Sequence, residues 1–315
     1  MNEPIFLKPI FKERIWGGTA LRDYFGYDIP SPHTGECWAV SAHPNGPSVV
    51  ANGPLKGKTL IELWNESRHL FGDIKGDVFP LLTKALDSAD DLSVQVHPGN
   101  YYAGSRENGE LGKNECWYVI DCEEGAEVIY GHYAQTREEF LELIEKDQWD
   151  KLLRWVPIKP GDFFNVPNGT IHALCKGALI LETQQSSDTT YRLYDYGRTD
   201  DQGHTRELHI DKALDVSNVP DQGQVIYPLT EDRGAVLITT YLRNDYFSVH
   251  KWAVEGEAFF KRQAPFLIVS VISGDGEIRV SEQVHSFSKG NHFIIPAGIQ
   301  EFFIEGSCEL IVSHL

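Results

Sequence analysis

Short runs of alternating apolar and polar residues dominate the chain and predict a mainly β protein. The clearest of these expected strands cover residues 35–44, 93–97, 115–120, 127–130, 163–166, 248–252, 266–272, 276–280 and 308–312. Turn residues rich in Gly, Pro, Asn and Asp separate the runs, and this regular spacing is typical of a β-sandwich or β-barrel.

Helical periodicity is confined to two stretches. Residues 59–71 place apolar side chains on one face after a capping box formed by Thr59 and Glu62. Residues 136–155 begin with the same pattern and predict one or two amphipathic helices, which would form a small helical insert. Between the two stretches, residues 101–114 are polar and Gly-rich, so we expect a long loop there.

One spacing pattern occurs twice along the chain. Residues 161–172 read G-x5-P-x-G-x2-H, and residues 290–301 read G-x5-P-x-G-x2-E. The apolar run predicts a buried strand and Pro-x-Gly a tight turn, so His172 should lie early on the returning strand and point into the space that the sheet encloses. An internal repeat of this kind predicts two related β modules, with Glu301 of the second at the position of His172.

Length and composition agree with two modules. The chain has 315 residues, of which 41% are hydrophobic, and no stretch of 18 apolar residues occurs. The first residues, 1–4, lack the basic and apolar regions of a signal peptide. We therefore expect a cytoplasmic protein without a membrane partner, divided into an N-terminal catalytic domain (residues 1–235) and a C-terminal domain (residues 236–315).

Charge and cysteine content narrow the possible chemistry. The formal net charge of −18 makes a nucleic-acid partner unfavourable, although a few local cations can still hold a small anion. The five cysteines are odd in number and contain no C-x-x-C pair, which speaks against a disulfide framework and against a thiolate zinc site. Any metal should therefore bind through nitrogen and oxygen.

Candidate ligands gather around one expected strand. Gln95 and His97 face the same side of residues 93–97, while Glu115 begins the next strand and His172 follows the Pro-x-Gly turn. Taken singly, His97 could be a turn residue, Glu115 a strand terminus and His172 a packed core residue. Taken jointly, two ligands on one strand face and a third delivered by a turn predict a metal site.

The pattern at residues 161–172 resembles the second motif of the cupin superfamily, whose fold is a double-sheet jelly roll with a metal in its mouth. Cupins usually pair this motif with an earlier H-x-H and a Glu. Here Gln95-x-His97 replaces H-x-H, and Glu115 follows after a long spacing, a combination that resembles type I mannose-6-phosphate isomerases, also called phosphomannose isomerases. Blocks similar to that family occur in the family's order at residues 14–18, 38–44, 92–98, 112–115, 167–172 and 190–196.

The resemblance implies two cupin-type double-sheet jelly rolls with a small α-helical insert near residues 136–155, the second jelly roll being free of metal. It implies an aldose–ketose isomerase that interconverts mannose 6-phosphate and fructose 6-phosphate through a metal-stabilised cis-enediol. It also implies one zinc ion per chain, bound by Gln95, His97, Glu115 and His172. This donor set also suits Mn²⁺, Fe²⁺ or Co²⁺. The expected partner is a sugar phosphate, and the expected state is a monomer or weak dimer.

The resemblance makes Arg192 the active-site arginine, whose planar guanidinium suits an enediolate or a phosphate. The alternative is a structural ion pair with Asp195. Lys113, two residues before Glu115, is expected to be catalytic or to bind phosphate.

The general base stays open among Lys113, Asp195, His43 and Lys84. For substrate binding we expect Arg192 with Ser93, Lys84 and Lys113, although Lys84 could also be a surface lysine.

Two other functions fit a cupin. A dioxygenase would need iron or copper and an apolar pocket, and the cations Lys113 and Arg192 weigh against it. A sugar-sensing protein without catalytic activity would normally carry a basic DNA-binding element, and this acidic chain shows none.

Overall fold

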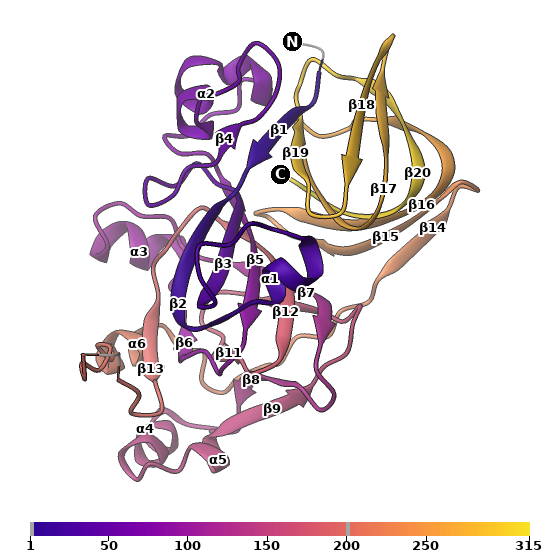
Figure 1. Cartoon of the computed structure of the whole chain (residues 1–315). Helices are drawn as coiled ribbons and strands as arrows, with labels where there is room; N and C mark the ends of the chain where they lie inside the picture. Colours follow the sequence, from indigo (N-terminus) through magenta and orange to yellow (C-terminus); the bar gives the residue numbers. More distant parts are fainter. Residues whose placement is uncertain (1–2, 200–201) are drawn as a thin grey trace.

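The computed structural model describes residues 3–199 and 202–315, and it confirms a mainly β chain with antiparallel strand pairing. The prediction that residues 1–4 lack the features of a signal peptide rests partly on Met1 and Asn2, and these two residues lie outside the described residues. Figure 1 shows two β modules packed side by side, with the C-terminal one in orange and yellow. None of the described helices combines the length and apolar character needed to cross a bilayer.

Two sheets form the N-terminal module. The first runs in the order β10-β7-β12-β5-β3-β2 and consists of β2 (Ile10–Gly18), β3 (Thr34–Val40), β5 (Leu81–Ser88), β7 (Glu115–Cys122), β10 (Phe163–Val166) and β12 (Ala178–Gln185). The second runs in the order β13-β6-β11-β8-β9 and consists of β6 (Val94–Val96), β8 (Glu127–His132), β9 (Leu153–Pro157), β11 (His172–Leu174) and β13 (Tyr191–Tyr194). Trp117 and Ile180 of the first sheet share a buried cluster with Val128 and Leu174 of the second, so the two sheets form a sandwich.

The first sheet is the central layer of the molecule. Every residue of β5 and of β12 is buried, because one face of the sheet packs inside the sandwich and the other packs against the C-terminal module. Side chains alternate between the two faces along each strand. Leu81 and Ala85 therefore join the core shared with the second module, whereas Lys84 and Leu86 point into the sandwich.

The helices lie around the N-terminal module, and their bounds are α1 (Ala20–Phe25), α2 (Leu60–Glu66), a 3₁₀ helix (Arg68–Phe71), α3 (Asn100–Arg106), α4 (Arg137–Glu145), α5 (Trp149–Leu152) and α6 (Ile210–Val216). The capping box of Thr59 and Glu62 is present at the start of α2. The predicted insert at 136–155 forms α4 and α5, and its last residues belong to β9.

The prediction of a loop throughout residues 101–114 was wrong at its start, where α3 forms. Tertiary contacts stabilise this short helix although Gly104 weakens its helical propensity. Ala103 is buried, Tyr102 donates to Asp215 at 3.0 Å, and the side chain of Asn100 accepts from the backbone of Gly112 at 2.8 Å. These partners are distant in sequence, so local composition does not reveal them.

The C-terminal module is one strongly curved sheet. It contains β14 (Leu229–Asp232), β15 (Val236–Arg243), β16 (Ser248–Lys261), β17 (Leu267–Val280), β18 (Gln283–Ser288), β19 (His292–Ile295) and β20 (Glu301–His314), together with the N-terminal strands β1 (Ile5–Lys8) and β4 (Val49–Val50). Residues 266–272 and 276–280, predicted as separate strands, belong almost entirely to the single strand β17.

A row of glycines explains why the three longest strands continue through the curve. Gly256 of β16 and Gly276 of β17 both lie opposite Gly306 of β20. Gly306 has φ +153°, and a Cβ there would lie 2.4 Å from the carbonyl oxygen of Asp275. A side chain cannot fit at this point, so glycine allows the strands to approach and bend without ending.

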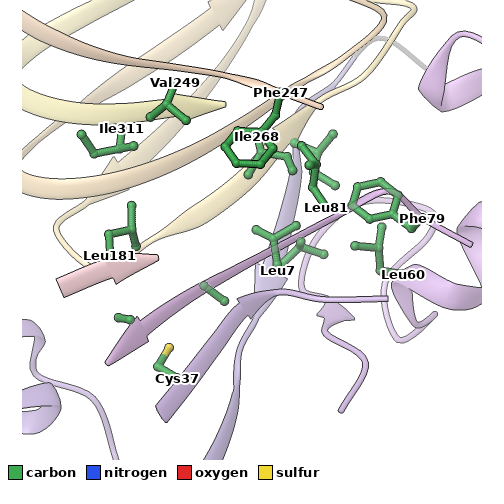
Figure 2. Close-up of a cluster of buried hydrophobic side chains, with 14 of the residues drawn as sticks. Leu7, Cys37, Leu60, Phe79, Leu81, Leu181, Phe247, Val249, Ile268 and Ile311 are labelled. Carbon is green, nitrogen blue, oxygen red and sulfur yellow. The ribbon is translucent and has the colours of Figure 1, made fainter. Parts of the chain in front are cut away.

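A shared hydrophobic core joins the two modules. Figure 2 shows Val249, Ile268 and Ile311 of the C-terminal strands facing Leu81 and Leu181 of the central sheet. Strand pairing joins them as well, because β1 pairs with β19 with Ile5 opposite Ile294. The modules therefore form one continuous structure.

Candidate functional site

Three predicted metal ligands meet inside the N-terminal sandwich. The candidate ligand atoms of His97, Glu115 and His172 all lie within 4.8 Å of one another. His97 Nε2 is 3.4 Å from Glu115 Oε2, and His172 Nε2 is 3.3 Å from Glu115 Oε1. All three residues are buried, and they come from the end of β6, the start of β7 and the start of β11.

The Pro-x-Gly turn holds these three segments in register. The backbone N–H of Asn168 donates to Asn114 Oδ1 at 3.0 Å, and the N–H of Gly169 donates to the carbonyl of His97 at 2.9 Å. Gly169 has φ +83°, a conformation that favours glycine. The turn before His172 is thereby bonded to the segments that carry the other two ligands.

Hydrogen bonds fix which nitrogen of each imidazole faces the centre. His97 Nδ1 donates to the carbonyl of Thr189 at 2.9 Å, and His172 Nδ1 donates to the carbonyl of Thr170 at 2.8 Å. Because a carbonyl can only accept, the Nε2 atoms are left unprotonated on the side of Glu115. Burial lowers the pKa of both imidazoles, that of His97 to about 3, so both are neutral ligands near neutral pH.

Glu115 supplies the negative charge at this centre. Burial alone would raise its pKa, but Lys113, His97 and His172 outweigh burial and hold it well below the ordinary value. Both carboxylate oxygens are buried without an aligned hydrogen-bond donor, although Lys113 Nζ lies 2.9 Å from Oε2. A buried carboxylate facing two imidazole nitrogens fits a divalent cation.

Gln95 lies beside this group. Gln95 of β6 lies opposite His172 of β11 in the strand pairing, and the side-chain amide nitrogen of Gln95 is 3.4 Å from His172 Nε2. A half-turn of the amide, which exchanges oxygen and nitrogen, would present the oxygen that a metal requires. Arg192 pairs with Gln95 on the other side, so Arg192, Gln95 and His172 form one row across the second sheet.

A second charged row lies on the central sheet. Lys84 of β5 pairs with Glu182 of β12, and Glu182 pairs with Trp117 of β7. Lys84 Nζ is 3.5 Å from Glu182 Oε2, and both side chains are buried, so the alternative of a surface lysine was wrong. Burial, followed by the nearby carboxylate of Glu115, raises the pKa of Glu182 to about 7.

The two rows border a cavity of about 420 Å³. Its lining brings together the predicted residues Lys84, Ser93, Gln95, Lys113 and Arg192. Arg192 Nε donates to Ser93 Oγ at 3.2 Å and Nη1 to the carbonyl of Glu207 at 2.8 Å. The cavity therefore offers several cations next to the metal-ligand group, as an anionic substrate requires.

Asp195 does not pair with Arg192 among the described residues. Its carboxylate binds two other arginines, with Oδ1 at 2.7 Å from Arg198 Nη2 and Oδ2 at 2.8 Å from Arg206 Nε. Burial would raise the pKa of Asp195, but the two arginines lower it. His43, another candidate base, is buried edge-on to Trp38 and is not among the described residues that line the cavity.

The sequence reasoning missed several residues that line the cavity, namely Arg14, Glu36, Glu182 and Arg206. Glu36 accepts from Trp38 Nε1 at 2.5 Å and from Arg14 Nε at 2.8 Å. A usable signal was present for Glu36, a carboxylate directly before the apolar residues 37–40 of β3. Glu182 gives no such signal, because it stands between the apolar residues 178–181 and the polar residues 183–185 of β12. No comparable signal marks Arg206, which lies in a polar segment outside the strands.

Comparison with known proteins identifies the same family. Residues 5–120 match the family model of the phosphomannose isomerase type I catalytic domain, and residues 237–315 match that of the mannose-6-phosphate isomerase cupin domain. The chain is 58% identical to the mannose-6-phosphate isomerase ManA of Bacillus subtilis, over 100% of this chain and 99% of that protein. It is 51% identical to the mannose-6-phosphate isomerase of Streptococcus mutans, with the same coverage.

Solved structures agree with this result. A crystal structure of the mannose 6-phosphate isomerase from Bacillus subtilis matches with a TM-score of 0.97 at 58% identity, covering 99% of each chain. A phosphomannose isomerase structure from Salmonella typhimurium matches with a TM-score of 0.80 at 16% identity, again over 99% of each chain, which shows a common fold. The full-length identity, the two family models and the fold together show that this chain belongs to the type I phosphomannose isomerase family.

Proposed function

We propose that this chain is a metal-dependent isomerase that interconverts mannose 6-phosphate and fructose 6-phosphate. The observation that carries the proposal is the buried group of His97, Glu115 and His172 at a cavity lined by cations. Relatives that share more than half of the sequence over its full length are named as mannose-6-phosphate isomerases. A dioxygenase or a purely sugar-sensing protein has no comparable support.

We further propose that the metal is one zinc ion per chain, held by His97, His172, Glu115 and the amide oxygen of Gln95. The two neutral imidazoles and the single carboxylate would leave the centre with a net positive charge. When bound, such an ion polarises substrate oxygens and stabilises negative charge that develops on them. Mn²⁺, Fe²⁺ and Co²⁺ suit the same donors.

The phosphate of the sugar is proposed to bind where Arg192 and Arg206 line the cavity, with Ser93 as a hydroxyl donor. Asp195 is proposed to act on Arg206 as a positioning residue, because arginines occupy its carboxylate and hold its pKa low. A guanidinium held in one orientation binds a phosphate with less loss of conformational entropy.

Glu182 is the proposed general base. Isomerisation removes a proton from C2 of the open-chain aldose, forms a cis-enediol, and returns a proton to C1. Glu182 faces the cavity, and its raised pKa suits a group that must both accept and release a proton near neutral pH.

Lys84 and Lys113 lie beside Glu182 and Glu115, respectively, where their charge would stabilise the enediol oxygens. Burial would lower the pKa of Lys113, but the carboxylates of Glu115 and Glu182 raise it. Lys113 therefore suits a cationic role better than that of a base.

Metal removal tests the proposed function directly. Treatment with a chelator should abolish isomerisation of mannose 6-phosphate, and added zinc should restore it. His172→Ala should lose bound zinc, measured by elemental analysis of the purified protein, and at least about 100-fold in kcat. His33→Ala, which changes an exposed histidine, is the control. Unchanged turnover in the chelated enzyme would exclude the metal role.

Solvent deuterium tests the enediol. Deuterium from the solvent should enter C2 of mannose 6-phosphate during turnover, because the proton on the base exchanges with water. Binding of the sugar phosphate without any conversion to the ketose would exclude an isomerase.

The domain limits and cellular context are also proposals. We propose a boundary between residues 235 and 236, next to the start of β15 and of the C-terminal family match, with β1, β4 and β14 from the N-terminal side of the boundary pairing into the C-terminal sheet. We propose that the enzyme acts in the cytoplasm, because five cysteines without disulfide bonds suit a reducing compartment. We also propose that it is a monomer or weak dimer.

A further inference from the structure

A second pocket lies in the C-terminal module, and it shares no lining residue with the catalytic cavity. Its volume is about 320 Å³, which is in the range of small-molecule sites. Strands β14, β15, β16, β17 and β20 and the segment 262–264 form its walls. No step of the proposed isomerisation uses it.

The pocket carries positive charge that carboxylates do not balance. Four cations and one carboxylate line it, although the whole chain has a net charge of −18. Arg233 pairs with Glu231, and Lys261 pairs with Glu301. Within residues 3–199 and 202–315, Arg243 and Arg262 have no carboxylate partner.

Arg262 is held in place by the second Pro-x-Gly turn. Its Nε donates to the carbonyl of Ile299 at 2.8 Å and its Nη2 to the carbonyl of Ala297 at 2.7 Å. The Nη1 group makes no hydrogen bond to the described residues. The turn that delivers His172 in the first module therefore anchors an arginine in the second, while Glu301 points to solvent and pairs with Lys261.

Two histidines on the pocket wall form a hydrogen-bond chain, and hydrogen bonds occupy all of their ring nitrogens, so none is free to bind a metal. His314 Nδ1 donates to the backbone oxygen of Leu315 at 2.8 Å, so His314 Nε2 accepts from His250 Nε2 at 3.1 Å. His250 Nδ1 then accepts from the hydroxyl of Thr240 at 2.9 Å. Burial, and after it the neighbouring His314 and Arg243, lower the pKa of His250 to about 4. Both histidines are therefore uncharged near neutral pH, and the charge of the pocket comes from its arginines, its lysine and Glu231.

The rest of the lining suits a body rich in hydroxyl groups. Thr230 and Gln263 offer both donors and acceptors above a buried aromatic floor, and Thr240 keeps only acceptor capacity because its hydroxyl donates to His250. The floor is rigid, because Trp252 and Phe260 stack with ring centroids 4.2 Å apart and Phe260 stacks on Phe302 at 5.3 Å.

We propose that this pocket is a second binding site, separate from the catalytic cavity, which takes a small sugar monophosphate. Arg243 and the unused Nη1 of Arg262 bind the phosphate, and Thr230 and Gln263 bind hydroxyl groups of the sugar. The pocket thus retains the cupin architecture but replaces metal ligands with arginines.

Isothermal titration calorimetry with mannitol 6-phosphate tests the proposal, because this alcohol has no carbonyl group and cannot be isomerised. The wild-type holoenzyme should bind two equivalents. Arg243→Gln should bind one, with affinity for the second equivalent reduced at least about tenfold, since a charged hydrogen bond is lost. Its kcat for isomerisation should equal that of the wild type, because Arg243 is exposed and remote from the catalytic lining.

Two controls assign the equivalents. Arg279→Gln, in the same module but paired with Glu257 outside the pocket, should retain both. Arg192→Gln should lose the catalytic equivalent and keep the other, so this outcome does not depend on whether the chain isomerises mannose 6-phosphate. A single equivalent in the wild type, or a second equivalent that survives Arg243→Gln, would overturn the proposal. Equal affinity for inorganic phosphate would exclude a sugar-specific site.

Discussion

Glu182 lies in the middle of a strand whose residues are all buried, and a buried carboxylate is costly unless it is paired or hydrogen-bonded. Its neighbours across the sheet are Lys84 and Trp117, and Trp117 Nε1 donates to it at 3.4 Å. It faces the cavity rather than the core shared by the modules. Function, rather than stability, is therefore the simplest physical reason for a carboxylate at this position.

Glu182→Gln keeps the shape of the side chain but removes the base. We expect kcat for mannose 6-phosphate isomerisation to fall at least about 100-fold, because general-base catalysis contributes this much, while KM changes little. Steady-state kinetics measures both constants, and Glu124→Gln on an exposed turn is the matched control. Wild-type kcat in Glu182→Gln would remove Glu182 from the mechanism.

The raised pKa of Glu182 also affects the stability of the metal-free protein. The folded chain holds this proton more tightly than the unfolded chain, so its contribution to stability is full below about pH 4.5 and is lost as pH rises through about 7. Glu182→Gln cannot ionise. In chelator, its melting temperature should therefore fall less between about pH 5 and about pH 8 than that of the wild type, as circular dichroism would show. Parallel pH profiles would contradict the assignment.

At the scale of elements, two antiparallel sheets place rows of polar and charged side chains opposite each other. Arg192, Gln95 and His172 lie across the second sheet, and Lys84 and Glu182 lie across the central one. Strand pairing, rather than proximity in sequence, thus builds the site. The segment after β13 adds Asp195, which holds Arg206 at the cavity.

Asp195→Asn should weaken the ion pair that holds the guanidinium of Arg206 in place, while Arg206 itself stays in the chain. We expect KM for mannose 6-phosphate to rise about tenfold and kcat to change little, because a positioned guanidinium is lost from the phosphate rather than from the reacting carbons. Inhibition by inorganic phosphate should weaken in parallel. Asp211→Asn on α6 is the control, and a large fall in kcat at unchanged KM would instead support a catalytic carboxylate.

Periodicity and motif spacing predicted most elements, because the β class, the capping box of α2 and the two-module repeat depend on local patterns. At α4 only half of the predicted capping box forms: the Thr136 side chain accepts from the N–H of Glu139, whereas the Glu139 carboxylate accepts from the N–H of Gln135. Motif spacing also assigned His97, Glu115 and His172 to one site, although up to 75 residues separate them in the chain. Such patterns failed where contacts outside a segment determine its secondary structure. The helix α3 is the example, because hydrogen bonds with Asp215 and Gly112 stabilise it. Lys84 and Glu182 were hard to assign because a strand buried on both faces shows no alternation that separates a site from a core.

At the scale of the whole molecule, an aromatic cluster joins the two modules. Phe266, next to β17, contacts Phe71 and Phe79 of the N-terminal module with ring centroids 5.5 and 5.4 Å apart. All three rings are almost fully buried. The interface has the character of a domain core, so the modules should unfold together.

Phe266→Ala should lower the free energy of unfolding by about 3–5 kcal/mol, because it removes a buried ring and leaves a cavity. Urea unfolding followed by tryptophan fluorescence and by circular dichroism should give one coincident transition for the wild type and for the variant. Phe259→Ala, at a half-exposed position of β16, should cost much less. Two separate transitions, of which only one shifts, would show that the modules unfold independently.

The pairing of β1 with β19 also sets an order of events during synthesis. Ile5 and Ile294 are about 290 residues apart in the chain, so the edge of β1 that pairs with β19 leaves the ribosome long before β19 exists. At roughly 5–20 residues per second, it waits on the order of 15–60 seconds. The other edge of β1 can pair early with β4, but the edge that faces β19 must be kept from other partners until β19 has been translated.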